Sequence, residues 1–201
     1  GLNVHEGAIT HEAVARDRPP FCLPLPVGIP RIYRHRRLLL PFLAAAIRRA
    51  DRWVHFENYI IRDDTTGRRF SEALAERARA GVAVRVLTDW LGSRGLGRRL
   101  AAELRAAGVE FRRFNPPRVL DLLGNAARDH RKLVVTDAGT AIVGGLCIGD
   151  EWAGDPAHGI RPWRDTAIQM DGPAAMALDH AFELTWTLAG GVIPPGRHAG
   201  E

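Results

Sequence analysis

The sequence predicts an α/β fold, an α/β/α sandwich in which a mixed β-sheet is flanked by helices. Two strand–helix–strand units follow one another between residues 53 and 114, a pattern typical of parallel strands joined by crossover helices. A β-hairpin at 132–143 then predicts antiparallel strands in the same sheet. Hydrophobic residues make up 46% of the 201 residues and charged residues 25%, as in an ordinary globular protein. We therefore expect one domain, at 31–201.

The first 30 residues lack a regular pattern, and prolines at positions 19, 20, 24, 26 and 30 interrupt any long element. We interpret residues 1–30 as an extended leader or linker. Because the sequence begins at Gly1 rather than at a methionine, we expect the chain to be a piece of a longer protein or a processed protein. Residues 38–47 have apolar side chains at helical spacing and predict an amphipathic helix packed on the core. The flanking arginines leave an interfacial membrane helix as the alternative.

The central part of the chain alternates strands and helices. The segment Trp53–Ile61 is rich in aromatic and β-branched residues, which is typical of a buried strand. The expected elements are that strand, a turn at 63–67, a helix at 70–80, a strand at 82–88, a helix that ends at Gly108 and a strand at 109–114.

The last part of the chain adds the hairpin, one more strand and one more helix. The hairpin pairs 132–136 with 140–143 across the turn Asp137-Ala138-Gly139. A long glycine-rich loop precedes a strand at 165–170. The final helix begins at Pro173, a residue well tolerated in a first turn, and its apolar stripe consists of Leu178, Phe182 and Trp186.

The charge pattern favours an anionic partner such as phospholipid or nucleic acid, since the formal net charge is +5. Among 28 lysine and arginine residues, Lys132 is the only lysine. An ammonium is a compact point charge whereas a guanidinium is a planar fork, so this position can require the ammonium. The two cysteines, Cys22 and Cys147, have no metal-binding or disulfide-framework spacing, and we expect neither metal nor cofactor.

The most informative residues are His130 and Lys132. Side chains alternate along a strand, so these two project from the same face, roughly 7 Å apart. An imidazole in this position can attack phosphorus, while the ammonium neutralises charge on the non-bridging oxygens. The alternative is a surface histidine and lysine at a strand end, with Asp137 as an ordinary turn residue.

His130, Lys132 and Asp137 match the HxKxxxxD motif, and this part of the sequence resembles the phospholipase D superfamily. The upstream segments 57–60 and 81–87 resemble bacterial cardiolipin synthases in particular. The other matching residues are Asp89, Gly92, Ser93, Gly144, Gly145, Ile148, Asp150-Glu151-Trp152, Trp163-Arg164-Asp165-Thr166 and Gly172-Pro173-Ala174. The resemblance runs from about Leu38 to Ala189.

The resemblance implies a reaction that uses two such motifs, which meet across a pseudo-two-fold axis. One histidine forms a phosphohistidine and the other protonates the leaving alcohol, without a metal. This chain holds one motif, and it resembles the N-terminal half of these enzymes. The implied partner is a second half in the same parent chain or a homodimer mate.

By the same resemblance, His130, Lys132, Asp137 and Asp165 are the expected catalytic residues. Asp165 orients the histidine of the opposite half, although an ordinary aspartate at a strand start is the alternative. Gly144, Gly145 and Cys147 are expected at the substrate phosphate, where relatives usually carry asparagine in place of Cys147. Glu57 is expected to face the substrate, with a structural carboxylate as the alternative.

The resemblance thus implies phosphatidyl transfer of the cardiolipin synthase type, with an anionic, phosphatidylglycerol-like phospholipid as partner. We expect a bacterial protein on the cytoplasmic side, peripheral at the inner membrane. The alternatives are a nuclease or other phosphodiesterase of the same superfamily, and a non-catalytic lipid-docking half. Nucleic acid is the less favoured partner.

Overall fold

The computed structural model describes residues 30–33, 36–117, 126–155 and 158–194. Seven strands form one sheet: β1 (Arg31–Tyr33), β2 (Trp53–Asn58), β3 (Ala83–Asp89), β4 (Glu110–Phe114), β5 (Lys132–Thr136), β6 (Thr140–Gly144) and β7 (Ala167–Asp171). Their order across the sheet is β1-β7-β6-β5-β2-β3-β4. β2, β3 and β4 are parallel, and the other neighbours are antiparallel. The sheet is therefore mixed, as predicted.

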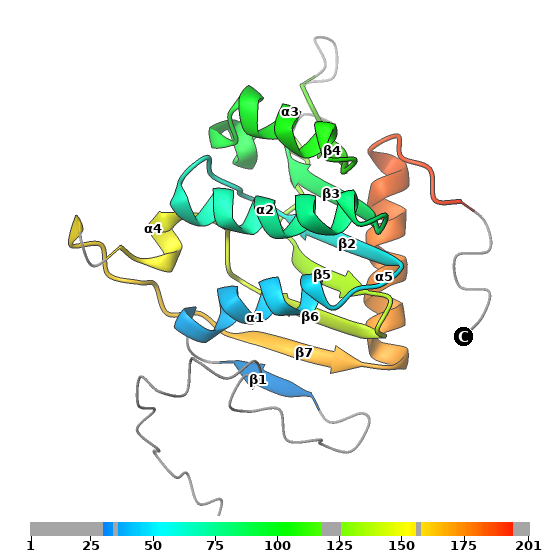
Figure 1. Ribbon diagram of the computed structural model, residues 1–201, viewed down its shortest axis with the longest axis horizontal. Helices are drawn as coiled ribbons and strands as arrows, with labels where there is room; N and C mark the ends of the chain where they lie inside the picture. The colour runs from blue at the N-terminus through cyan, green and yellow to red at the C-terminus, as the bar shows by residue number, and fades with distance from the viewer. Residues whose placement is uncertain (1–29, 34–35, 118–125, 156–157, 195–201) are drawn as a thin grey trace, which may run out of the picture.

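Helices cover both faces of this sheet (Figure 1). The helices α1 (Arg36–Arg48), α2 (Thr65–Arg79) and α3 (Arg98–Ala106) contribute to one hydrophobic core. The helix α5 (Pro173–Leu188) packs against the opposite face and forms a second core. A short helix, α4 (Asp150–Ala153), and a 3-10 turn, η2 (Gly92–Gly95), lie in loops. This arrangement confirms the α/β/α sandwich.

The central strands are buried on both faces because their side chains alternate between the two cores. In β5, Val134 joins the core beneath α1 and α2, whereas Leu133 and Val135 join the core beneath α5. Phe182 and Trp186 of α5 are fully buried, which confirms the predicted apolar stripe. Polar side chains of these central strands can therefore reach a substrate at the strand ends, where the helices do not cover them.

Helix α1 is packed on the core. Its side chains Phe42, Leu43, Ala46 and Ile47 are buried, as the core-packed interpretation predicted. None of the described helices is long and apolar enough to cross a membrane.

Several boundaries differ from the predictions. Helix α2 begins at Thr65 rather than at residue 70, because Asp64 caps it: its Oδ1 accepts from the Gly67 amide at 2.8 Å. The predicted turn is thus the first helical turn. Strand β7 begins at Ala167, so Asp165 lies in the loop before it. The sequence pattern did not predict β1 or α4, because these elements are only three and four residues long. Of the predicted leader at 1–30, residues 1–29 lie outside the described residues.

Candidate functional site

One end of the sheet gathers the residues that the sequence singles out. β2 and β5 are antiparallel, with Asn58 opposite Lys132, so the end of β2 meets the beginning of β5. Across the sheet, Gly144 at the end of β6 pairs with Ala167 at the beginning of β7. β3 also ends here because it is parallel to β2. We call this end of the sheet the site edge.

His130 and Lys132 form a contacting pair in the middle of the site edge. Nζ of Lys132 lies 3.0 Å from Nδ1 of His130 and donates to the His130 carbonyl oxygen at 2.7 Å. The His130 ring packs on the Tyr59 ring, with centroids 4.5 Å apart, and Nζ lies 5.1 Å from the centre of the Tyr59 ring. His130 is exposed and Lys132 is buried. The imidazole is therefore open to solvent, with an ammonium directly behind it.

This contact has a consequence for protonation. Burial lowers the pKa of Lys132 from its ordinary value, while the nearby acidic side chains Cys147, Asp129 and Asp165 oppose that shift. As long as Lys132 is an ammonium, it donates to Nδ1 of His130, and the neutral ring carries its proton on Nε2. In this arrangement the Nε2–H group can donate a hydrogen bond to an oxygen.

The predicted residues Asp165 and Gly145 lie against each other beside Lys132. A Cβ atom on Gly145 would come within 2.8 Å of Oδ1 of Asp165, so only glycine allows the carboxylate this close to the chain. Oδ1 of Asp165 also accepts from the Thr166 amide at 2.6 Å. A side chain on Gly144 would likewise collide with Ala167 and with the Thr166 carbonyl oxygen. The two glycines let the loops of β6 and β7 approach closely.

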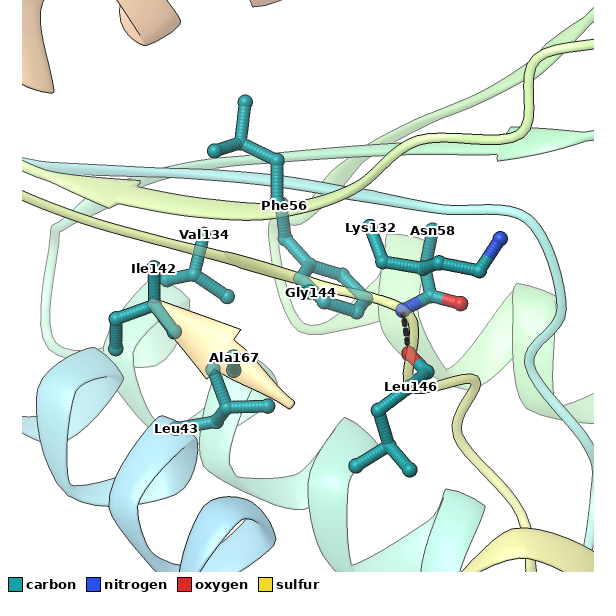
Figure 2. Close-up of a pocket in the computed structure, with 10 residues that line it drawn as sticks. Leu43, Phe56, Asn58, Lys132, Val134, Ile142, Gly144, Leu146 and Ala167 are labelled. Carbon is teal, nitrogen blue, oxygen red and sulfur yellow. Dashed lines mark hydrogen bonds between the residues drawn. The ribbon is translucent and has the colours of Figure 1, made fainter. Parts of the chain in front are cut away.

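Cys147 lies near enough to Lys132 for the two side chains to interact electrostatically. Burial raises the pKa of the Cys147 thiol, an effect that the charge of Lys132 partly offsets. Asn58 lies on the same side of the sheet and donates from Nδ2 to the Leu146 carbonyl oxygen at 3.1 Å (Figure 2). Figure 2 also shows Lys132 and Asn58 at one end of a largely apolar pocket between the sheet and α1.

Two buried carboxylates hold the chain segment that carries His130. Oδ2 of Asp89, at the end of β3, accepts from the Asp129 amide at 3.0 Å. Oε1 of Glu57, in β2, accepts from Nη2 and Nε of Arg131 at 2.8 and 3.1 Å. The residues on both sides of the histidine are thus fixed to neighbouring strands, which positions the ring between them.

Glu57 does not reach the same face as Lys132. Its partner Arg131 also donates to the Ala181 carbonyl oxygen at 3.1 Å, which places this pair beneath α5, whereas Lys132 lines the pocket beneath α1. Burial and the adjacent Asp129 carboxylate raise the pKa of Glu57 to about 9, against the opposing effect of the Arg131 guanidinium. The substrate-binding role expected for Glu57 does not fit this position. The alternative, a structural carboxylate, does.

Asp137 is not brought to the histidine–lysine pair. It follows the other end of β5, five residues and therefore roughly 17 Å from Lys132. Its oxygens accept from the amides of Asp51, Arg52 and Trp53 at 3.0 to 3.4 Å. A catalytic role for Asp137 does not fit this placement, because its carboxylate fixes the beginning of β2.

Sequence reasoning missed Tyr59 and Asn58 as parts of the site. Both lie in the segment 57–60 that resembles cardiolipin synthases, so the resemblance offered a signal, but their contact with His130 and Lys132 depends on the β2–β5 pairing. Within the described residues, no group of three His, Cys, Asp or Glu side chains could hold a metal ion.

Comparisons with known proteins show which proteins this chain is similar to. The chain is 42% identical to the cardiolipin synthase of Geobacillus kaustophilus over 144 residues, 71% of the chain and 28% of that protein. It is 40% identical to the major cardiolipin synthase of Bacillus subtilis over 149 residues, 73% of the chain and 30% of that protein. The chain therefore spans under a third of these relatives. No protein-family model matches.

Solved structures share the fold. Nuc of Salmonella typhimurium, a phospholipase D family member, aligns with a TM-score of 0.57 and 16% identity over 80% of the chain and 96% of Nuc. The chain belongs to the phospholipase D superfamily. A second superfamily fold, the phosphatidylserine synthase of Haemophilus influenzae, aligns with a TM-score of 0.59 and 14% identity over 75% of the chain and 35% of that structure.

Proposed function

We propose that this chain is the first half of a cardiolipin synthase-like phosphatidyltransferase that acts through a phosphohistidine intermediate. The observation that carries the proposal is the 3.0 Å contact between Nζ of Lys132 and Nδ1 of the exposed His130. It lies in a chain about 40% identical to proteins named cardiolipin synthase.

The proposed reaction joins two phosphatidylglycerol molecules. A nitrogen of His130, or of its counterpart in the second half, attacks phosphorus, and the bond from phosphorus to the glycerol headgroup oxygen breaks. The other histidine gives its proton to that oxygen, and glycerol leaves. The hydroxyl of a second phosphatidylglycerol then loses its proton to the same histidine and attacks phosphorus. The phosphohistidine bond breaks, and the products are diphosphatidylglycerol and glycerol.

The side chains of the site edge have complementary tasks in this reaction. The Lys132 ammonium neutralises charge on the non-bridging phosphate oxygens. The Tyr59 ring supports the His130 imidazole from one side. Asp165 lies beside Lys132 and orients the histidine of the second half. A neutral Cys147 thiol occupies the place of the asparagine that is usual in relatives, and donates weakly to phosphate.

The partners we propose are an anionic phospholipid and a second HxKxxxxD half, in the same parent chain or in a homodimer mate. Because the substrate is a membrane lipid, we place the bacterial parent protein on the cytoplasmic side, peripheral at the inner membrane.

The parent protein with both motifs tests this function. Offered phosphatidylglycerol vesicles, it is expected to form diphosphatidylglycerol and glycerol in equal amounts, and the His130→Asn variant is expected to form neither. Single-stranded DNA offered to the same preparation should remain intact. Cleavage of the DNA without lipid product would assign the site to a phosphodiesterase that acts on nucleic acid.

A further inference from the structure

Exposed apolar side chains lie on both sides of the histidine–lysine pair. Leu91, which follows β3, is 43% exposed, and its amide donates to the same Asp89 carboxylate that holds the segment carrying His130. On the other side, Ile160 and Trp163 precede β7 and are 40% and 58% exposed. Large apolar side chains in water are costly to display, so a group of them beside one site indicates a contact surface.

The segment that carries Ile160 and Trp163 is held in this outward position by its backbone. The amide of Asp155 donates to the Ile160 carbonyl oxygen at 2.9 Å, and the amide of Ile160 donates to the Asp155 carbonyl oxygen at 2.9 Å. The Trp163 amide donates to the Trp152 carbonyl oxygen at 3.3 Å, and the two indole rings lie edge to face at 6.4 Å. In Figure 1 this yellow segment projects from the body of the molecule beside α4.

The same segment carries two arginines, in a stretch that also contains Asp155 and Asp165. Arg161 and Arg164 are both exposed, and neither forms an ion pair with any residue that the structure describes. Two of the neighbouring carboxylates are paired with other residues, since Glu151 lies 3.5 Å from Arg62 and Asp155 lies 2.5 Å from His158, while Asp165 accepts from the Thr166 amide at 2.6 Å. The arginines are therefore available to an anionic partner.

We propose that Leu91, Ile160, Arg161, Trp163 and Arg164 form a docking face that seats the site edge on an anionic lipid bilayer. Tryptophan favours the boundary between headgroups and acyl chains, and arginine is drawn to anionic headgroups. Docking through this face brings His130 and Lys132 to the depth of the lipid phosphates, because Asp165 follows Arg164 directly and lies beside Lys132. The choice of lipid rests on the proposed function, whereas the geometry of the face does not.

Vesicle binding of the 201-residue chain tests the proposal without any turnover. Sedimentation with vesicles of equal parts phosphatidylglycerol and phosphatidylcholine is expected to weaken about 25-fold in Arg161→Ala/Arg164→Ala, at about fivefold per arginine. Trp163→Ala is expected to weaken it about tenfold. Binding to pure phosphatidylcholine should be weak in the wild type and insensitive to the arginine change.

Matched controls lie at the opposite end of the sheet. Arg48→Ala/Arg49→Ala removes the same charge from exposed positions at the end of α1, and Met176→Ala truncates an exposed apolar side chain at the start of α5. Both should bind like the wild type. Losses equal to those of the docking-face variants, or a wild-type chain that ignores phosphatidylglycerol vesicles, would overturn the proposal.

The parent protein separates this inference from the proposed function. Brominated phosphatidylglycerol should quench a fraction of its tryptophan fluorescence that Trp163→Phe removes. Quenching of Trp163 in a parent that makes no lipid product would contradict the proposed function and leave the docking face intact. A Trp163 that is quenched in the 201-residue chain but not in the parent would show that the second half covers this face, and would overturn the inference.

Discussion

Nζ of Lys132 lies 3.0 Å from Nδ1 of His130 and 2.7 Å from the carbonyl oxygen of the same residue. The ammonium is thus bonded to both the ring and the backbone of the histidine that it assists. Because Lys132 is buried and its Nζ faces the Tyr59 ring, the space around this charge is closed on the protein side. A compact cation fits this position, and the phosphate must approach from the solvent side.

Lys132→Arg is therefore expected to inactivate the parent enzyme although it keeps the charge. The planar fork is larger than an ammonium and cannot keep both contacts with His130, so it displaces the imidazole or the phosphate. Misplacement alone can cost roughly 100-fold in turnover. Steady-state rates on phosphatidylglycerol vesicles measure this, with the melting temperature as the check on folding. Turnover at the wild-type rate would remove Lys132 from the site.

Asp137→Ala is expected to reduce stability rather than chemistry. The substitution removes the charged acceptor shared by three backbone amides at and just before the start of β2, at a cost of roughly 1–3 kcal/mol in the free energy of unfolding. Urea denaturation measures this cost. Asp51→Ala, which removes an exposed carboxylate next to the same strand, should change stability by less than about 0.5 kcal/mol. A stable but inactive Asp137→Ala parent would restore a catalytic role for this residue.

The sequence was sufficient for the sandwich and for the histidine–lysine pair, because both follow from short-range periodicity. The alternation expected of an extended chain is enough to put His130 and Lys132 on one side, although β5 begins only at Lys132. The position of Asp137 depends instead on the direction of the strand, which carries it to the far end of the sheet. Tyr59 reaches His130 only because β2 pairs with β5, and one sequence does not encode that pairing in its local pattern.

Glu57 shows a second limit of prediction from the sequence, since a buried carboxylate in a strand can face either of the two cores. In the structure the Glu57 side chain lies on the α5 side of the sheet, where Arg131 forms an ion pair with it. Alternation along β2 gives no sign of which side faces the site until α1 and α5 are assigned to their faces.

Glu57→Gln is expected to flatten the dependence of stability on pH. The pKa of Glu57 is about 9 in the folded chain and about 4.5 when unfolded, so between these values the native state holds a proton that the unfolded state lacks. Its contribution is complete below pH 4.5 and is lost as the pH rises through 9. Glutamine stays neutral, so the variant should lose less stability than the wild type between pH 5 and 9.

Urea denaturation at several pH values measures that difference. The control is Glu72→Gln, which neutralises an exposed carboxylate on α2 and should follow the wild-type curve. Parallel curves for wild type and Glu57→Gln would mean that Glu57 is ionised in the folded chain, and that Arg131 rather than a proton balances its charge.

The last prediction concerns Asp165, which lies beside Lys132 at the site edge, not on the far side of the sheet. In-line displacement places the entering and leaving groups on opposite sides of phosphorus, so one histidine cannot serve both at once. General acid help is worth roughly 100- to 10,000-fold, and the 201-residue chain as a monomer should therefore be folded but nearly inactive. Asp165 is then available to a histidine that this chain does not supply.

In the parent protein, Asp165→Asn is expected to lower turnover at least about 100-fold while leaving the melting temperature close to that of the wild type. Asparagine keeps the size of the side chain and can still accept from the Thr166 amide, but it lacks the charge that holds a histidine's tautomer and stabilises the imidazolium. A merely structural Asp165 would change stability without changing the pH profile. An orienting Asp165 should shift the alkaline limb of the pH profile of turnover to lower pH on substitution, because the histidine that acts as general acid loses the carboxylate that favours its protonated form. An unchanged pH profile with normal turnover would show that the second histidine is oriented from elsewhere.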